Sequence, residues 1–328
     1  MDLSLNTFGT VLAKENGQFL VIHTDGKQTI SPSDIRSISI SRGAQITSDA
    51  ALLAIENQID VMFVDGKGTP LGRIWSVKYG SISTIRRKQL DFTFSKQAVP
   101  WINGIIAQKI ENQIALIFSI CPDDWTNSAK INVVMGKLND YKNKVLKLQG
   151  EIVNDIAPTL RGWEGAASKV YFETLGLWVP DYYSFKQRSQ HPATDVFNAM
   201  LNYGYGILYG KVEGALIKAG IDPYVGVLHR DDYNRPVLAF DIIELFRVWI
   251  DYVVMNLSQQ NAINEDCISR KPDGSVWLET LGRRILIQSV SDYLNEIINM
   301  KGLDRTRLTH IDLYAQNLAQ TFLKLKFD

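Results

Sequence analysis

The chain has 328 residues, of which 45% are hydrophobic and 21% charged, and its formal net charge is zero. This composition is typical of a folded globular protein, and the zero net charge argues against a protein that binds polyanions over its whole surface. Two isolated cysteines exclude a disulfide framework and a zinc cluster, and the lack of a signal-peptide pattern and of a run of about 18 apolar residues predicts a cytoplasmic protein without a membrane segment.

The first 80 residues predict β structure. Apolar runs predict strands over residues 19–23, 35–40, 59–64 and 71–75, and a short helix over residues 48–57. Asn16-Gly17 and Asp25-Gly26, on either side of the first of these strands, are hairpin signals. We therefore expect a small β-rich N-terminal domain over residues 1–80.

From residue 81 onward the apolar residues recur at three- and four-residue spacing, which is typical of helices. Helices are predicted over residues 101–119, 130–152 and, starting from the N-cap Asp195, up to Lys218. One short hairpin is expected around residues 271–277. The predicted fold class is α+β, with the β-rich domain followed by a larger all-α catalytic domain over residues 81–328.

Residues 225–251 contain a loop with one histidine, followed by a predicted helix that is apolar on nearly every side. The polar residues in this segment that could carry chemistry are His229, Asp241, Glu244, Arg247 and Asp251. Residues three apart share a helix face, so Asp241 and Glu244 project together, and a buried charge must be paired or bound to a metal. With His229 twelve positions upstream, the pattern suggests a divalent-metal site. Pairing of Glu244 with Arg247 and a satisfied loop histidine are the alternative explanation.

A third carboxylate lies upstream, where Glu164 stands between Gly162 and Gly165. Glycines allow the backbone to approach closely, and we expect Glu164 at or near the start of a helix. An alternative is a first-turn glutamate that is placed favourably against the helix dipole.

Several segments together resemble the CRISPR-associated integrase family, CRISPR-associated protein one. They are I-D-V-M-F-V-D-G-K-G-T-P-L-G (59–72), A-Q-K-I-E-N-Q (107–113), G-W-E-G-A-A-S-K-V-Y-F (162–172), H-P-A-T-D-V-F-N-A-M-L-N-Y-G-Y (191–205), G-V-L-H (226–229) and N-R-P-V-L-A-F-D-I-I-E-L-F-R (234–247). The resemblance covers roughly residues 4–300, and the motifs follow one another in the family's order and spacing.

The resemblance implies a homodimer with a β N-terminal lobe and a helical catalytic lobe. It implies assembly with CRISPR-associated protein two and insertion of a short duplex prespacer into the repeat and leader of a CRISPR array, by attack of a 3′-hydroxyl on a phosphodiester. It also implies Mg²⁺ or Mn²⁺ bound by Glu164, His229 and Glu244, with Asp241 as a further ligand or as an orienting neighbour. All four residues are thereby predicted to be catalytic.

Basic residues are the predicted DNA contacts, namely Arg86, Arg87, Lys88, Arg188 and Arg247. For the first three, a solvated helix face is the competing explanation.

Two other functions are compatible with these residues. One is a casposase-type transposon integrase, although such proteins often carry extra C-terminal DNA-binding segments and this chain ends at Asp328. The other is a non-catalytic DNA-binding scaffold subunit. A scaffold subunit would gain nothing from burying unpaired carboxylates, because each such charge costs roughly several kcal/mol of stability.

Overall fold

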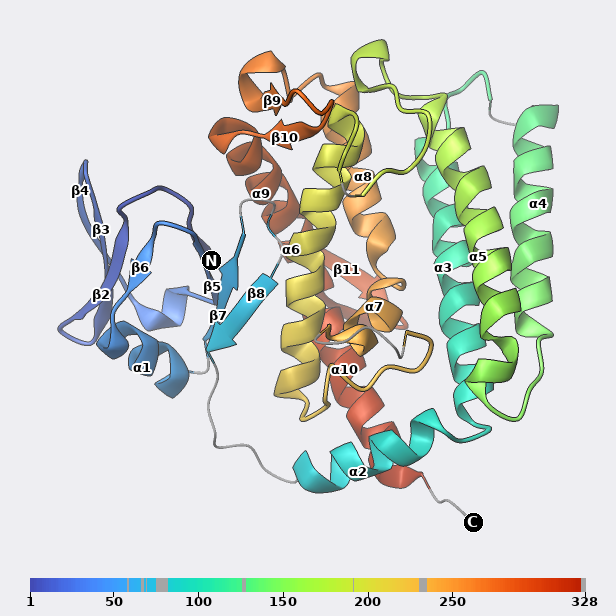
Figure 1. Cartoon of the computed structure of the whole chain (residues 1–328), viewed down its shortest axis with the longest axis horizontal. Coiled ribbons are helices and arrows are strands. Elements are labelled where there is room, and N and C mark those ends of the chain that lie inside the picture. The colour runs from blue at the N-terminus through green and yellow to red at the C-terminus, as the bar shows by residue number, and fades with distance from the viewer. Residues whose placement is uncertain are drawn as a thin grey trace. The chain divides into compact units, whose positions relative to one another are not determined.

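The computed structural model describes residues 1–57, 59–65, 68, 70–74, 82–125, 128–190, 192–229 and 235–325. The chain divides into two compact units, Met1–Gly80 and Ser81–Asp328. The first is rich in strands and the second is largely helical (Figure 1), so the predicted α+β class is confirmed. That the helical unit carries the catalytic site is still a prediction.

The N-terminal unit contains two four-stranded sheets. One has the order β1-β5-β7-β8 and the other the order β4-β3-β2-β6. The bounds are β1 Asp2–Leu5, β2 Val11–Glu15, β3 Gln18–His23, β4 Gly26–Ile30, β5 Ser37–Ser41, β6 Gln45–Ile46, α1 Ser48–Glu56, β7 Asp60–Val64 and β8 Pro70–Ile74. The two sheets and α1 share one apolar core, which includes Leu12, Phe19, Ile38, Leu53 and Val61. Burial of these side chains is the main stabilising contribution in this unit.

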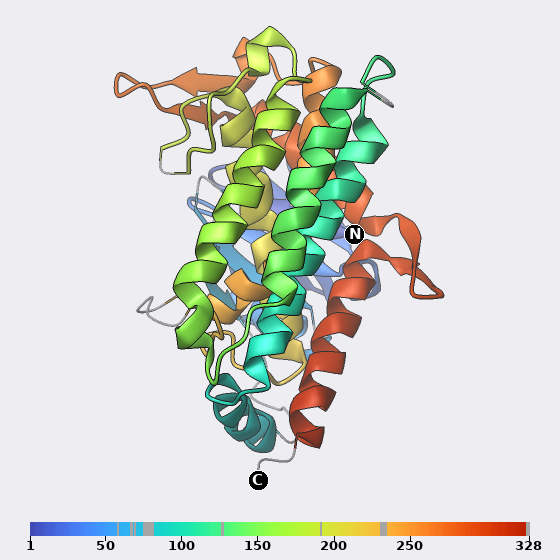
Figure 2. The same cartoon turned by 90° about the vertical axis from the view of Figure 1, so that its right-hand side faces the viewer.

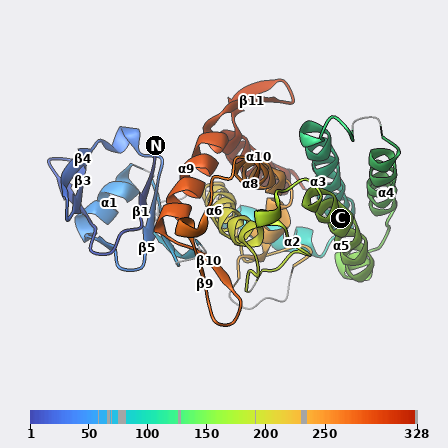
Figure 3. The ribbon, with the colours of Figure 1, turned by 90° about the horizontal axis from the view of Figure 1, so that it is seen from above.

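The helical unit has the following elements: α2 Ile82–Thr93, α3 Ala98–Ile120, α4 Ala129–Leu146, α5 Val153–Gly176, α6 Val196–Lys218, α7 Val237–Ile243, α8 Arg247–Gln259, β9 Ile268–Arg270, β10 Val276–Leu278, α9 Thr280–Asn295, β11 Ile297–Met300, β12 Leu303–Thr306 and α10 Arg307–Lys324. Helices α3, α4 and α5 run side by side and each contacts the other two, as a three-helix bundle (Figure 2). Seen from above, α6 lies among α8, α9 and α10, beside that bundle (Figure 3). None of the described helices is long and apolar enough to cross a membrane.

Helix α6 forms the centre of the unit because it is apolar on almost every side, as is typical of a buried helix. Its N-cap Asp195 accepts a hydrogen bond from the amide of Asn198 at 2.7 Å, as the sequence predicted. Gly204 lets α8 approach closely, since a Cβ on this glycine would lie 2.5 Å from Cγ2 of Ile250.

The structure corrects the predicted helix across the segment that contains Asp241, Glu244 and Arg247. Instead of one helix there are α7 and α8, separated by a three-residue break in which Leu245 donates to Ile242 O at 3.1 Å. The amide of Asn112 on α3 donates to Leu245 O at 2.9 Å and so satisfies a carbonyl at the break. An apolar pattern on all faces is the same for a continuous and a broken helix, so the sequence did not reveal the break.

The prediction that Glu164 starts a helix was wrong. Glu164 lies in the middle of α5, and the preceding helix ends at Leu146 rather than at residue 152. The real start is fixed by Asp155, whose Oδ2 accepts from the amides of Glu151 and Ile152 at 3.0 Å each. The all-α description was also too strict, because the hairpins β9–β10 and β11–β12 belong to this unit, and only the first was predicted.

A buried acid ties three helices together. Asp251 on α8 is 1% exposed, and its Oδ2 accepts from the Tyr171 hydroxyl of α5 at 2.8 Å while its Oδ1 accepts from the Tyr205 hydroxyl of α6. Burial raises the pKa of Asp251 from 3.8 to about 6, against the lowering effect of both hydroxyl donors. Between pH 4 and 6, roughly, the folded chain therefore keeps a proton on Asp251 that the unfolded chain has released. As the pH rises through this range, the contribution of Asp251 to the free energy of unfolding falls.

We predict that Tyr171→Phe destabilises the protein by roughly 1–3 kcal/mol at pH 7.5, because it removes a donor from a buried carboxylate. The loss should be smaller at pH 5, where the folded protein keeps this carboxyl protonated. Denaturant unfolding at both pH values measures it, with Tyr224→Phe at an exposed tyrosine as the control. Equal losses at the two pH values would contradict this account.

Candidate active site

A lysine lies between two of the predicted metal ligands. Lys109 on α3 is only 6% exposed, and its ammonium contacts Oε1 of Glu164 on α5 and lies 2.5 Å from Oε2 of Glu244 at the end of α7. Three segments that are far apart in sequence thus place two carboxylates against the ammonium group of Lys109.

Both carboxylates have further partners. Arg247 Nε donates to Oε1 of Glu244 at 2.8 Å, and the Ser168 hydroxyl donates to Oε1 of Glu164 at 2.9 Å. Burial alone would raise the pKa of Glu244, but the charges of Arg247 and Lys109 outweigh it and lower this pKa to about 2. Glu244 is therefore ionised at neutral pH. Glu164 is the more open acid, with 26% of its side chain exposed against 10% for Glu244.

His229 is held by Asp241 instead of sharing a ligand set with it. Nδ1 of His229 lies 2.7 Å from Oδ1 of Asp241, whose Oδ2 accepts from the amides of Val227 and Leu228 at 2.8 and 3.0 Å. The hydrogen bond that His229 makes with Asp241 raises the pKa of the imidazole above its usual value, although burial lowers it. With Nδ1 fixed in this way, Nε2 is the ring nitrogen left for a metal or a proton.

The turn before His229 depends on a glycine. A Cβ on Gly226 would lie 2.2 Å from the carbonyl oxygen of His229 and 2.8 Å from a methyl of Val237. Any larger residue would displace the backbone that carries the imidazole.

The acids and the histidine do not form a complete ligand set in this structure. Within the described part of the chain, no three histidine, cysteine, aspartate or glutamate side chains gather closely enough to hold one ion. The residues nevertheless fit a divalent cation. An ammonium occupies the place between Glu164 and Glu244, and Oε2 of Glu244 is buried and accepts no well-formed hydrogen bond. The Glu244 charge also acts on His229, and carboxylates with one imidazole suit Mg²⁺ and, more so, Mn²⁺.

Two of the predicted DNA-binding arginines contact other parts of the protein. The Arg247 guanidinium lies 4.6 Å above the Tyr205 ring, in addition to its bond with Glu244. Arg188 donates to the side chains of Asn198 and of Asn202, the latter at 2.9 Å. These contacts favour a structural role for both.

The predicted basic cluster on α2 is divided in the structure. Lys88 Nζ donates to the carbonyls of Leu323 and Leu325 at 3.0 and 2.5 Å, at the C-terminal end of α10. Arg86 is half-buried and Arg87 is exposed. Arg87 is thus the member of this cluster whose side chain is most open to solvent.

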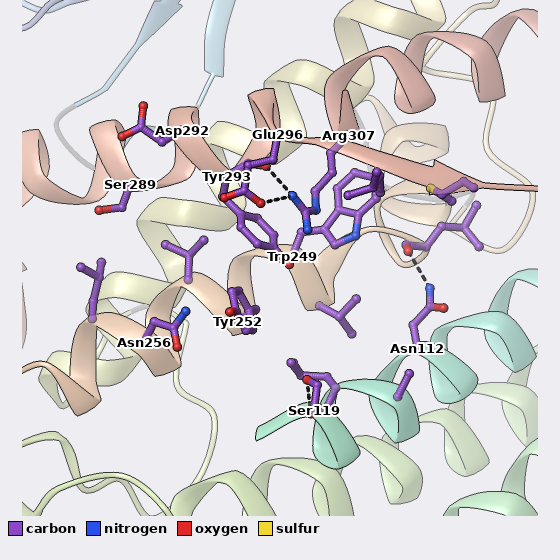
Figure 4. Close-up of a pocket in the computed structure, with 18 of the residues that line it drawn as sticks. Asn112, Ser119, Trp249, Tyr252, Asn256, Ser289, Asp292, Tyr293, Glu296 and Arg307 are labelled. Carbon is purple, nitrogen blue, oxygen red and sulfur yellow. Dashed lines mark hydrogen bonds and ion pairs between the residues drawn. The ribbon is translucent and has the colours of Figure 1, made fainter. Parts of the chain in front are cut away.

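A trough of about 740 Å³ lies on another side of the α7–α8 break (Figure 4). Its lining includes Asn112, Leu245 and Trp249, together with Tyr293 and Arg307 from the C-terminal part of the unit. It shares Asn112 and Leu245 with the surroundings of the acidic site, but the two acids and His229 do not line it.

Sequence reasoning missed Lys109. The signal was available, because Lys109 follows Ile102, Ile105 and Ile106 at helical spacing and therefore lies on the buried stripe of α3. A lysine on such a stripe requires a buried partner.

Comparisons with known proteins identify the family of the chain. Residues 3–292 match the family model "CRISPR associated protein Cas1". "CRISPR-associated endonuclease Cas1 1" of Archaeoglobus fulgidus is 32% identical over 97% of this chain and 95% of its own, and its namesake in Thermus thermophilus is 26% identical over 98% and 96%.

Solved structures share the fold. A casposase bound to integration product has a TM-score of 0.83 with 22% identity, over 100% of this chain and 92% of its own. A Cas1 protein from Thermotoga maritima has 0.81 with 18% identity, over 99% and 98%. A Cas6-RT-Cas1–Cas2 complex has 0.80 with 22% identity, over 98% of this chain and 35% of that one. The match to the family model across most of the chain, together with the full-length relative at 32% identity, shows that this chain belongs to the Cas1 family of CRISPR-associated proteins.

Proposed function

We propose that this chain is a metal-dependent DNA endonuclease and integrase that inserts short duplex DNA into a CRISPR array. The observation that carries the proposal is the pair of acids from α5 and the α7–α8 break, of which Glu244 is buried and Glu164 half-buried. Both contact the ammonium of Lys109, and the charge of Glu244 acts on His229, which Asp241 fixes. Relatives along the full length are named CRISPR-associated endonucleases, which supports the same activity here.

In this proposal Glu164, His229 and Glu244 are the metal ligands. A bound divalent ion would supply Lewis-acid stabilisation for the attacking and leaving oxygens of a phosphodiester. Glu244 binds without first losing a proton, because its pKa is about 2. Asp241 fixes the imidazole through Nδ1 and so keeps Nε2 free. The nucleophile is a DNA 3′-hydroxyl in integration and water in cleavage.

The proposed partners are DNA, a second copy of this chain and the small protein Cas2. The DNA is a short prespacer duplex and the repeat and leader of the array, and an enzyme that acts on this chromosomal DNA works in the cytoplasm. One structure with the same fold belongs to a Cas6-RT-Cas1–Cas2 complex, which supports Cas2 as a partner.

The casposase-type integrase is a second candidate, because a casposase bound to integration product shares the fold along the whole chain. The scaffold alternative also stays open to test. The main objection to a scaffold was that it would bury unpaired carboxylates. In the structure, however, Lys109 pairs with both acids and Arg247 also pairs with Glu244. The DNA ends used in an assay separate the first two functions, and activity separates both from a scaffold.

We predict that Glu244→Ala, Glu164→Ala and His229→Ala each reduce strand transfer by at least about 100-fold while the fold is kept. The assay joins a short duplex with free 3′-hydroxyls to a supercoiled plasmid that carries a CRISPR array, in Mn²⁺, with and without Cas2. Glu173→Ala, an exposed glutamate on the same helix as Glu164, is the matched control and should keep full activity.

The same assay contains the contrary outcomes. EDTA should stop joining and added Mn²⁺ restore it, and activity that resists the chelator would refute metal catalysis. Joining of transposon ends in preference to prespacers would favour the casposase function. An inactive protein with and without Cas2 would favour the scaffold.

Asp241→Asn should raise the Mn²⁺ concentration for half-maximal activity by about 10- to 100-fold, because an amide orients the histidine less firmly than a carboxylate. A structural defect alone would lower the amount of active enzyme without moving this concentration. Asp140→Asn, at an exposed aspartate on α4 that pairs with Lys144, is the control and should leave the Mn²⁺ dependence unchanged.

We propose Arg87, with Arg86, as a DNA contact on α2. Replacement of Arg87 by alanine should lower the slope of log affinity against log salt by about 0.9, the value for one phosphate contact on duplex DNA. Lys88→Ala should instead reduce thermal stability, because Lys88 caps the end of α10. An unchanged slope in Arg87→Ala would identify this arginine as a solvated charge on a helix face.

A further inference from the structure

The buried lysine between the two acids has no part in the function proposed so far. Lys109 is on the apolar stripe of α3, where Ile105, Ile106 and Ile110 are buried with it. A lysine at the protein surface would be enough to offset the charge of solvent-exposed acids. A lysine that is buried against two acids is instead part of the construction of the site.

The contacts of Lys109 involve the oxygens that a metal would need. Its ammonium contacts Oε1 of Glu164 and Oε2 of Glu244. Arg247 binds Glu244 through the other oxygen, Oε1, and is held over the Tyr205 ring. A cation on Oε2 of Glu244 and on Glu164 could therefore leave Arg247 in place, whereas it would compete with Lys109 for the same position.

The charges of the two acids and of the two cations that contact them are balanced. Glu164 and Glu244 contribute two negative charges, and Lys109 and Arg247 contribute two positive charges. A divalent ion added to these four charges gives an excess of two positive charges, of which Asp241 beside His229 offsets one, in a region where burial strengthens repulsion. A phosphate of bound DNA would remove part of that excess.

We propose that Lys109 is a built-in competitor of the metal, which keeps metal affinity low in the free protein and couples metal binding to the arrival of a DNA phosphate. The inference rests on the proposed function, because it assigns Glu164 and Glu244 as ligands. In the free protein Lys109 holds both acids in position. When the metal binds, the ammonium leaves the shared oxygens, and a DNA phosphate compensates the added charge.

The test measures bound Mn²⁺ directly, by electron paramagnetic resonance of the free ion, with and without a short DNA duplex. For the wild-type chain we expect weak binding that DNA strengthens. Lys109→Met should bind Mn²⁺ at least 10-fold more tightly without DNA and should gain less from DNA. Lys109→Arg keeps the charge and should bind Mn²⁺ weakly in the absence of DNA. Lys142→Met, at a lysine on α4 that pairs with Glu111, is the matched control and should resemble the wild type.

Two measurements keep the outcomes distinct. Thermal unfolding with and without Mn²⁺ shows whether Lys109→Met folds. If this variant does not fold, Lys109→Gln is measured in its place. If these variants bind Mn²⁺ no more tightly than the wild type, Lys109 only holds the two acids in position and the inference is overturned. If the wild type with DNA binds no more Mn²⁺ than Glu244→Ala, the proposed metal site itself fails.

Discussion

The burial of opposite charges where α3, α5 and the α7–α8 break meet is the constraint on which the helical unit depends. Lys109, Glu164 and Glu244 come from segments that are far apart in sequence, and each has its charge satisfied by the others. Removal of one partner from such a group typically costs about 3–5 kcal/mol, since it leaves a buried charge without compensation. The helices that carry these residues therefore pack more stably against one another when all three residues are in place.

The break between α7 and α8 gives this junction its form. Glu244 ends one helix and Arg247 begins the next, so the acid and the arginine that binds it belong to separate helices. The carbonyl of Leu245 takes its donor from Asn112, one turn beyond Lys109 on α3. The same helix thus supplies both the cation for the acids and the hydrogen bond at the break. Further along α8, Asp251 and its two tyrosines fix this helix against α5 and α6.

Local signals in the sequence predicted the local parts of the structure. The N-cap of α6, four of the eight described strands of the first unit (β3, β5, β7 and β8) and, as an alternative explanation, the pairing of Glu244 with Arg247 follow from residues close together in the chain. The start of α5 was missed because Glu164, between its two glycines, was placed at or near the start of a helix, while Asp155 upstream was the actual cap. Lys109 was missed because its partners lie 55 and 135 positions away, and such contacts exist only in the folded chain.

The turn at Gly226 joins several of these elements. This glycine, the two amides that follow it, Asp241 and His229 form one closed set of contacts, in which each position depends on the others. A side chain at Gly226 would clash most closely with the carbonyl oxygen of His229, the residue that carries the imidazole. Folding and chemistry can therefore diverge at this position during evolution, and a descendant of this chain could lose the reaction through one codon while its architecture persists.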